Sequence, residues 1–175
     1  MCIRDRIDTM RRFLDGLYGA AGLLAGLCTI GVLVSVLAAI VARQLGLNIP
    51  GTDAYAGYFM AAAGFLALAS TFKHGEHIRV TLLLNSLSPA GSRRLDIFAL
   101  AMGCLLAATF AFFSVKLAYD SWQFNDISTS NDATPLWIPQ LSMAAGTLLF
   151  LVALLDELVR RSRGLAAATS QQTHE

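Results

Sequence analysis

Charged residues are missing from four long stretches of this 175-residue chain. Asp, Glu, Lys and Arg make up 14% of the sequence, hydrophobic residues make up 55%, and the mean hydropathy is +0.58. Each stretch is long enough to cross a hydrocarbon core of about 30 Å at roughly 1.5 Å per residue. The composition excludes an ordinary soluble domain and predicts an all-α integral membrane protein with four transmembrane helices. The predicted spans are about 17–42, 54–72, 97–115 and 133–155, within a single membrane domain (1–175) that ends in a polar tail (162–175).

The interiors of these stretches also lack histidine, because His74, His77 and His174 all fall outside them. Ionisable groups inside a membrane usually mark proton relays, ion sites or substrate counter-ions, so their absence argues against an independent ion-coupled pump. Haem held between helices needs axial ligands such as a pair of histidines facing each other across the bilayer, and no such pair is present. We therefore expect no cofactor and no metal site.

Cysteine is scarce, and Cys2, Cys28 and Cys104 form no C-x-x-C pair. This excludes a membrane thiol oxidoreductase and a zinc site built on cysteine pairs. The loops contain no glycine-rich phosphate loop and no catalytic group with room to fold around it. We predict that the chain is not an enzyme, and we assign no catalytic, substrate-binding or nucleic-acid-binding residue.

Basic residues are concentrated in three of the five segments outside the spans. Lys and Arg flanking transmembrane helices stay on the cytoplasmic side, so this distribution predicts that both chain ends and the central loop lie in the cytoplasm. An even number of spans is consistent with that orientation. The three basic groups are Arg4, Arg6, Arg11 and Arg12; Lys73, Arg79, Arg93 and Arg94; and Arg160, Arg161 and Arg163, whereas the other loops have only Arg43 and Lys116.

The central loop is longer than a turn requires. From His77 to Ser88, apolar residues recur at roughly helical spacing beside polar ones, which predicts a short helix lying at the inner membrane interface. Pro89 is expected to end it, and an irregular loop is the alternative.

The predicted outer loop from Lys116 to Pro135 is net acidic. Aromatic side chains at its ends have the placement of interfacial rings, and Pro135 and Pro139 are expected to fix the start of the fourth span. Membrane anchoring and contact with an extracytoplasmic protein both remain open as roles. The acidic residues that could make such a contact are Asp120, Asp126 and Asp132, and the aromatic residues are Tyr119, Trp122 and Trp137.

Small residues recur at helical spacing in the first and third spans. Such stripes let helix backbones approach closely, which gives dispersion contacts in a solvent where the hydrophobic effect adds nothing. Packing within the chain and docking to another subunit explain the pattern equally well. The residues concerned are Gly22 and Gly26 in the first span, and Ala99, Gly103, Ala107 and Ala111 in the third.

Several motifs taken in order resemble one known family. They are Arg43 with Pro50-Gly-Thr-Asp53, then Gly75-Glu-His-Ile-Arg-Val-Thr-Leu-Leu83, then Thr134-Pro-Leu-Trp-Ile-Pro139 followed by Gly146. Their order, with the helix number and loop lengths from about Phe13 to Arg161, resembles the small (Q-type, DctQ-like) membrane subunit of tripartite ATP-independent periplasmic (TRAP) transporters.

The resemblance implies a function that depends on partners. In such systems a periplasmic binding protein captures an organic anion, a large membrane subunit moves it inward with a sodium gradient, and the small subunit joins the large one in the bacterial inner membrane. It implies structural roles for the matching residues, which are Arg43, Glu76, His77, Arg79, Pro135, Trp137, Pro139 and Gly146.

Two other classes of protein also contain small helical membrane subunits. One is an anchor or assembly subunit of a redox complex, which would need haem or quinone ligands. The other is a small exporter working as a homodimer, which would need an acidic residue within the membrane. Neither requirement is met by the residues above.

Overall fold

The computed structural model describes residues 2–47, 49–73, 89–129 and 133–162. These contain the helices α1 (Cys2–Gln44), α2 (Thr52–Lys73), α4 (Pro89–Gln123) and α5 (Trp137–Ser162). Each includes a segment long and apolar enough to cross a membrane, so the predicted all-α fold with four spans is confirmed. The segments are Leu14–Gln44, Thr52–Phe72, Arg93–Gln123 and Trp137–Ser162. The predicted interfacial helix at 77–88, and the tail beyond Ser162, lie outside the described residues.

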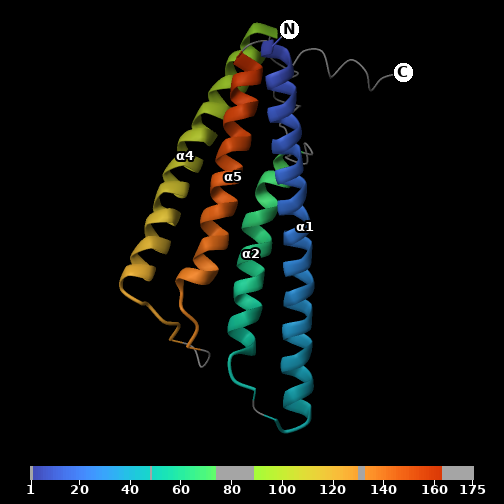
Figure 1. The fold of residues 1–175 in the computed structure, drawn as a ribbon, viewed down its shortest axis with the longest axis vertical. Helices are drawn as coiled ribbons and strands as arrows, with labels where there is room; N and C mark the ends of the chain where they lie inside the picture. The colour runs from blue at the N-terminus through green and yellow to red at the C-terminus, as the bar shows by residue number, and fades with distance from the viewer. Residues whose placement is uncertain (1, 48, 74–88, 130–132, 163–175) are drawn as a thin grey trace, which may run out of the picture.

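The four helices form a row (Figure 1). α1 packs on α2, α2 packs on α5, and α5 packs on α4, so α1 and α4 are the outer members of the row. The start of α1 and the end of α5 lie at the same end of the molecule, which we call the terminal end. The opposite end, which we call the loop end, holds the connections 45–51 and 124–136. The row thus consists of two helical hairpins joined by the contact between α2 and α5.

Helix α4 continues beyond residue 115, where its uncharged stretch ends. It runs to Gln123, so Lys116 and Asp120 lie on the helix and not in the loop predicted from 116 to 135. A lysine near a helix end extends its ammonium group toward water while its methylene chain stays in the apolar layer, so the charge does not require the helix to stop. The connection to α5 is correspondingly shorter than predicted.

Prolines occupy positions where a helix does not need their missing N–H. Pro89 is the first residue of α4, where proline is favoured, and Pro139 is the third residue of α5. The first four N–H groups of a helix have no partner within it, so Pro139 removes no hydrogen bond from α5.

The contact between α4 and α5 is made by small side chains. Six buried residues of α4 follow one another at alternating intervals of three and four, and two of them, Cys104 and Ala107, form a buried cluster with Leu154 of α5. The buried hydroxyls bond within their own helices, as Ser114 Oγ donates to the Phe110 carbonyl at 2.8 Å. Close approach of the two backbones follows from this composition. The six residues are Cys104, Ala107, Ala111, Ser114, Ala118 and Ser121.

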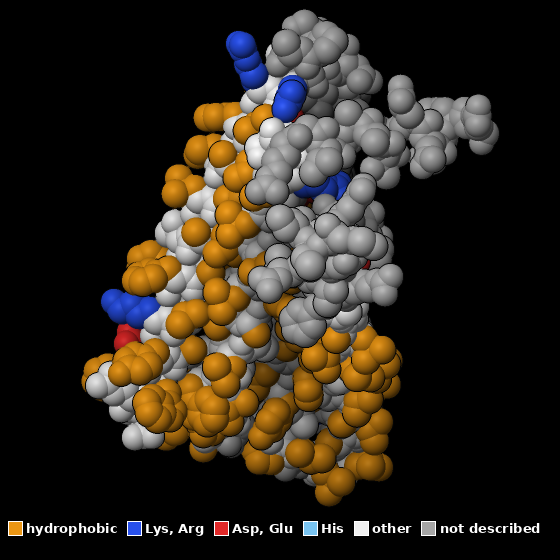
Figure 2. Space-filling view, turned by 45° about the horizontal axis from the view of Figure 1, so that its top comes forward, with side chains coloured by type: hydrophobic (Ala, Val, Ile, Leu, Met, Phe, Trp, Pro, Cys, Tyr) orange, Lys and Arg blue, Asp and Glu red, His pale blue; other side chains and the backbone are white. Residues whose placement is uncertain are grey.

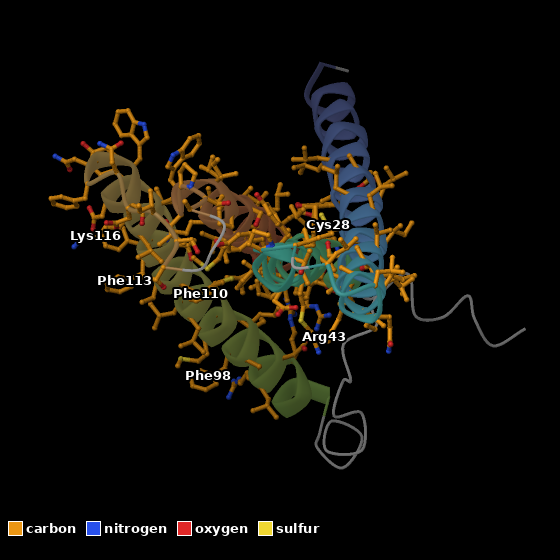
Figure 3. All side chains as sticks on the ribbon, turned by 90° about the horizontal axis from the view of Figure 1, so that it is seen from below. Cys28, Arg43, Phe98, Phe110, Phe113 and Lys116 are labelled. Atoms are coloured by element: carbon orange, nitrogen blue, oxygen red, sulfur yellow. The ribbon has the colours of Figure 1, made fainter. Side chains whose placement is uncertain are left out.

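Large hydrophobic side chains cover the outside of the row. Leu23 on α1 is 67% exposed and Phe112 on α4 is 66% exposed. Figure 2 shows orange side chains over much of the visible face, with the blue Lys and Arg side chains mainly toward the terminal end. Figure 3 shows Phe98 and Phe113 of α4 pointing away from α5. Contiguous apolar surface on this scale is suited to lipid or to another membrane subunit and not to water.

Candidate functional site

Among the described glycines, Gly146 is the one at which an added Cβ would lie nearest to another helix, and this contact joins the two hairpins. A Cβ added at Gly146 of α5 would lie 2.5 Å from the carbonyl carbon of Phe65 on α2 and 2.9 Å from its Cβ. Gly22 of α1 is similarly close to α2, since a Cβ there would lie 2.8 Å from Ser70 Oγ. Glycine at these two positions sets how near the neighbouring helices come to α2.

The other residues predicted to pack differ in their surroundings. A Cβ at Gly26 would meet nothing within 4 Å, whereas a Cβ at Gly103 would lie 3.9 Å from Leu154. Ala107 and Ala111 are buried, while Ala99 is exposed. The predicted stripe on α4 is therefore divided between contact with α5 and an open surface.

An ion-pair network joins α4 to α5 at the terminal end. Arg161 donates from its guanidinium to Asp96 on α4 and, at 2.7 Å, from Nε to Glu157 on its own helix. Arg160 also pairs with Glu157, at 3.1 Å. The spacing of four between Glu157 and Arg161 is a sequence signal for a pair on one helix. Asp96 lies 65 positions away, so sequence reasoning missed it.

A groove of about 670 Å³ opens beside this network. Its walls come from α2 and α4 and its floor from α5, so it lies on one broad face of the row. The terminal end of the groove is charged, whereas the rest is lined mainly by apolar and small side chains, including Leu68, Leu106 and Leu154. The charged residues are Asp96, Asp156, Glu157, Arg160 and Arg161. Nothing in the sequence pattern indicated this groove, because all four described helices contribute to its lining, α1 through Tyr18.

At the loop end, the connection between α4 and α5 folds back on itself. Ile127 and Pro135 form an antiparallel bridge, Ser128 N donates to the Thr134 carbonyl at 2.8 Å, and Leu136 N donates to the Asp126 carbonyl at 2.9 Å. Pro135 lies in this bridged segment and Trp137 begins α5. The backbone hydrogen bonds give this outer segment a defined shape.

α1 and α4, the two helices whose C-terminal ends lie at the loop end, finish in the same C-terminal motif. In α1, Leu47 N donates to the Ala42 carbonyl at 2.9 Å and Gly46 N to the Arg43 carbonyl at 3.3 Å. Gly46 has a φ of 69°, which defines a Schellman motif. Arg43 lies in the last turn of α1 and is exposed, and it lines a small hollow of about 340 Å³ to which Asp53 also contributes.

The equivalent motif in α4 is centred on Asn125, which has a φ of 50°. Asp126 N donates to the Ser121 carbonyl at 3.0 Å and Asn125 N to the Trp122 carbonyl at 3.4 Å. Asparagine tolerates the left-handed conformation better than most residues other than glycine. The motif directs the chain from α4 into the bridged segment.

The predicted acidic residues lie in different settings. Asp120 is half-buried on the last turn of α4, and Asp126 is exposed where the bridged segment begins. Asp132, like Glu76, His77 and Arg79, lies outside the described residues. Among the residues that are described, no three His, Cys, Asp or Glu side chains come together as metal ligands.

Comparison with known proteins identifies the family. Residues 32–164 match the family model described as "Tripartite ATP-independent periplasmic transporters, DctQ component". The match covers well over half of the 175 residues. The chain belongs to the DctQ family. It is thus the small membrane subunit of a TRAP transporter, a multi-pass inner-membrane protein and not an enzyme. A search of curated proteins found no match to the chain.

The DctQ match includes α2, α4, α5 and the last part of α1, residues 32–44. It therefore contains the ion-pair network, the bridged segment and the lining of the groove except Tyr18. It also contains every residue of the family motifs from Arg43 to Gly146, whereas Gly22 and Gly26 precede it. As a family, DctQ components work with a large membrane subunit and a periplasmic binding protein.

Proposed function

We propose that this chain serves a sodium-coupled TRAP transporter that imports an organic anion, a carboxylate. In this assignment it braces the large membrane subunit within the bilayer and helps the periplasmic binding protein to dock. It carries neither the sodium site nor the substrate site.

The main support for assigning the sodium and substrate sites to another subunit is that the interiors of the described helices are uncharged. Sodium and a carboxylate need polar or charged partners when they cross a membrane, and intramembrane ionisable residues usually supply them. The described helices offer none between their flanking charges, and this supports placing both sites on the large subunit. The uncharged intervals are 16–42 in α1, 54–72 in α2, 97–115 in α4 and 137–155 in α5.

Orientation follows from the basic residues. The terminal end holds Arg93, Arg94, Arg160 and Arg161 among the described residues, and we assign it to the cytoplasm. The loop end is then periplasmic, which places the bridged segment where a binding protein arrives. We assign Asp120, Asp126 and Asp132 to electrostatic contact with that protein, and Pro135, Trp137 and Pro139 to shaping the docking surface. Arg43, Glu76, His77 and Arg79 are assigned to fixing helix ends and the inner interfacial segment.

Sodium-driven uptake into proteoliposomes tests the proposal. Vesicles would hold the cognate large subunit with or without this chain, and the binding protein would be loaded with radiolabelled carboxylate outside. We expect uptake that needs a sodium gradient and that falls to background when the chain is omitted. Equal uptake without the chain, or uptake unaffected by collapsing the sodium gradient, would contradict the proposal.

A further inference from the structure

We propose that the groove face of the row, made by α2, α4 and the floor of α5, is where a transmembrane helix of the large subunit packs. This inference rests on the proposed function and adds to it the surface that is used. The opposite face and the outer sides of α1 and α4 then face lipid. Three observations lead to this face.

The first is the shape and size of the groove. A cavity of about 670 Å³ open to the membrane must be filled, because empty space loses dispersion contacts along its whole lining. Its lining includes Ala99 and Gly103 from α4, and these small side chains leave room for a helix to approach the floor of the groove.

The second is an open stripe of small residues on α2 that continues the groove toward the loop end. Gly57, Ala61, Gly64 and Leu68 are separated by intervals of four, three and four, which places them on one side of the helix. Leu68 lines the groove. The three small residues are exposed, and a Cβ at Gly57 or Gly64 would meet nothing within 4 Å.

The third is the charge at the terminal end of the groove. Three carboxylates and two guanidinium groups lie there, so this group of side chains has one negative charge in excess. Arg160 Nε is buried and has no hydrogen-bond acceptor in the part of the chain that the structure describes. The cytoplasmic ends of transmembrane helices are rich in Lys and Arg, and these side chains would complement the excess carboxylate. The C-terminal end of a helix also has unpaired carbonyl groups, which could accept a hydrogen bond from Arg160 Nε.

The sides assigned to lipid have a different composition. On α4, the exposed residues Phe98, Leu105 and Phe112 are large and apolar, and they do not line the groove. On α1, Leu23, Ile30 and Leu33 are each more than half exposed. Bulky aliphatic and aromatic surface keeps helix backbones apart, whereas an open glycine and alanine stripe beside a groove brings them together.

Photo-crosslinking at two neighbouring leucines of α4 tests the proposal. Leu105 and Leu106 are 60% and 66% exposed, but only Leu106 lines the groove. p-Benzoylphenylalanine would be placed at each position in the full chain, co-expressed with its large subunit, and irradiated in membranes. We expect a crosslink to the large subunit from position 106 and at most a trace from position 105.

A matched pair of alanine substitutions gives a second measurement. Ala61 lies on the stripe and Ala108 on another exposed part of α4, so Ala61→Leu and Ala108→Leu add the same volume to exposed helix positions. Overpacking weakens a helix contact, so Ala61→Leu should lower the recovery of the large subunit with the tagged chain about tenfold. Ala108→Leu should leave recovery unchanged.

The outcomes separate the two proposals. If uptake needs the chain but position 106 crosslinks only to lipid or to a second copy of this chain, the assigned face is wrong and the proposed function stands. Crosslinking to the large subunit from position 105 in place of 106, or equally from both, also overturns the inference. If the unsubstituted chain neither recovers the large subunit nor affects uptake, both proposals fail.

Discussion

Gly146 of α5 lies so close to Phe65 of α2 that a methyl group at position 146 would overlap the backbone of the neighbouring helix. The contact joins the two helical hairpins, and a backbone atom cannot move aside as a flexible side chain can. The residue at position 146 therefore controls the distance between α2 and α5.

Gly146→Ala should destabilise the protein in detergent by about 1–3 kcal/mol, the usual cost of overpacking. Gly26→Ala is the matched control, because a Cβ there meets nothing within 4 Å. Thermal unfolding followed by fluorescence-detected size exclusion measures both variants. A melting temperature for Gly146→Ala equal to that of Gly26→Ala would show that α2 and α5 can separate without cost.

Removing Arg161 should cost more than removing its neighbour Arg160. The Arg161 side chain is 12% exposed and bridges Asp96 and Glu157. The Arg160 side chain is 39% exposed and, among the residues that the structure describes, forms an ion pair with Glu157 only. Arg161→Gln removes the partner of the partly buried Asp96 and leaves Glu157 with Arg160, which we expect to cost about 1–3 kcal/mol. Arg160→Gln should cost less than about 1 kcal/mol.

A double-substitution cycle isolates the bond between the helices. Asp96→Asn and Arg161→Gln, alone and together, would be compared by thermal unfolding. We expect non-additive losses, because the second substitution removes a contact that the first has already broken. Additive losses would mean that the pair contributes nothing to holding α4 on α5.

The two Schellman motifs predict substitutions of opposite effect. Gly46 has a φ of 69°, so Gly46→Ala should cost about 1 kcal/mol, because a Cβ is strained in the left-handed region. Asn125 has a φ of 50°, so Asn125→Gly should leave stability unchanged or slightly raised. The same unfolding measurement checks both, and destabilisation by Asn125→Gly would assign a side-chain role to Asn125.

Neutralising the outer acidic residues should slow uptake at low salt. Asp120→Asn, Asp126→Asn and Asp132→Asn together remove three charges from the assigned docking surface, and electrostatic attraction acts chiefly on association rate. We expect initial uptake to fall about tenfold at low ionic strength and to recover toward that of the unsubstituted chain at high salt.

The control for that experiment changes charge at the other end of the chain. Asp5→Asn, Asp8→Asn and Asp15→Asn alter the net charge by the same amount and should leave uptake unaffected. An outer triple variant that transports at the normal rate at low salt would remove the three aspartates from the docking surface.

Both chain ends are expected in the cytoplasm. Green fluorescent protein fused after Glu175 should fluoresce, whereas alkaline phosphatase at the same position should be inactive, because each reporter works on one side of the inner membrane only. Inserting the phosphatase after Thr129, at the loop end, should give activity. The reverse pattern would invert the assigned orientation and move the acidic residues away from the periplasm.

Hydropathy and charge were sufficient to predict the number of helices, because a span needs only a long apolar run. The end of α4 was misplaced because Lys116 and Asp120 interrupt that run without ending the helix. The sequence pattern could not predict which residues face a neighbouring helix. Gly22 and Gly26 have the same setting in the sequence, yet of these two only Gly22 faces Ser70. The ion pair between Asp96 and Arg161 and the groove depend on how distant segments meet, which local periodicity does not record.

The row order also bears on how the protein is made. α1 and α2 are adjacent in the chain, as are α4 and α5, so each hairpin can form as soon as its second helix leaves the ribosome. The contacts between the two hairpins, chiefly those of α2 with α5, have to wait for the whole chain. Two separately synthesised halves, divided between α2 and α4, should therefore associate in the membrane and form the complete subunit. This association should depend on Gly146, because it sets the close contact of α5 with α2.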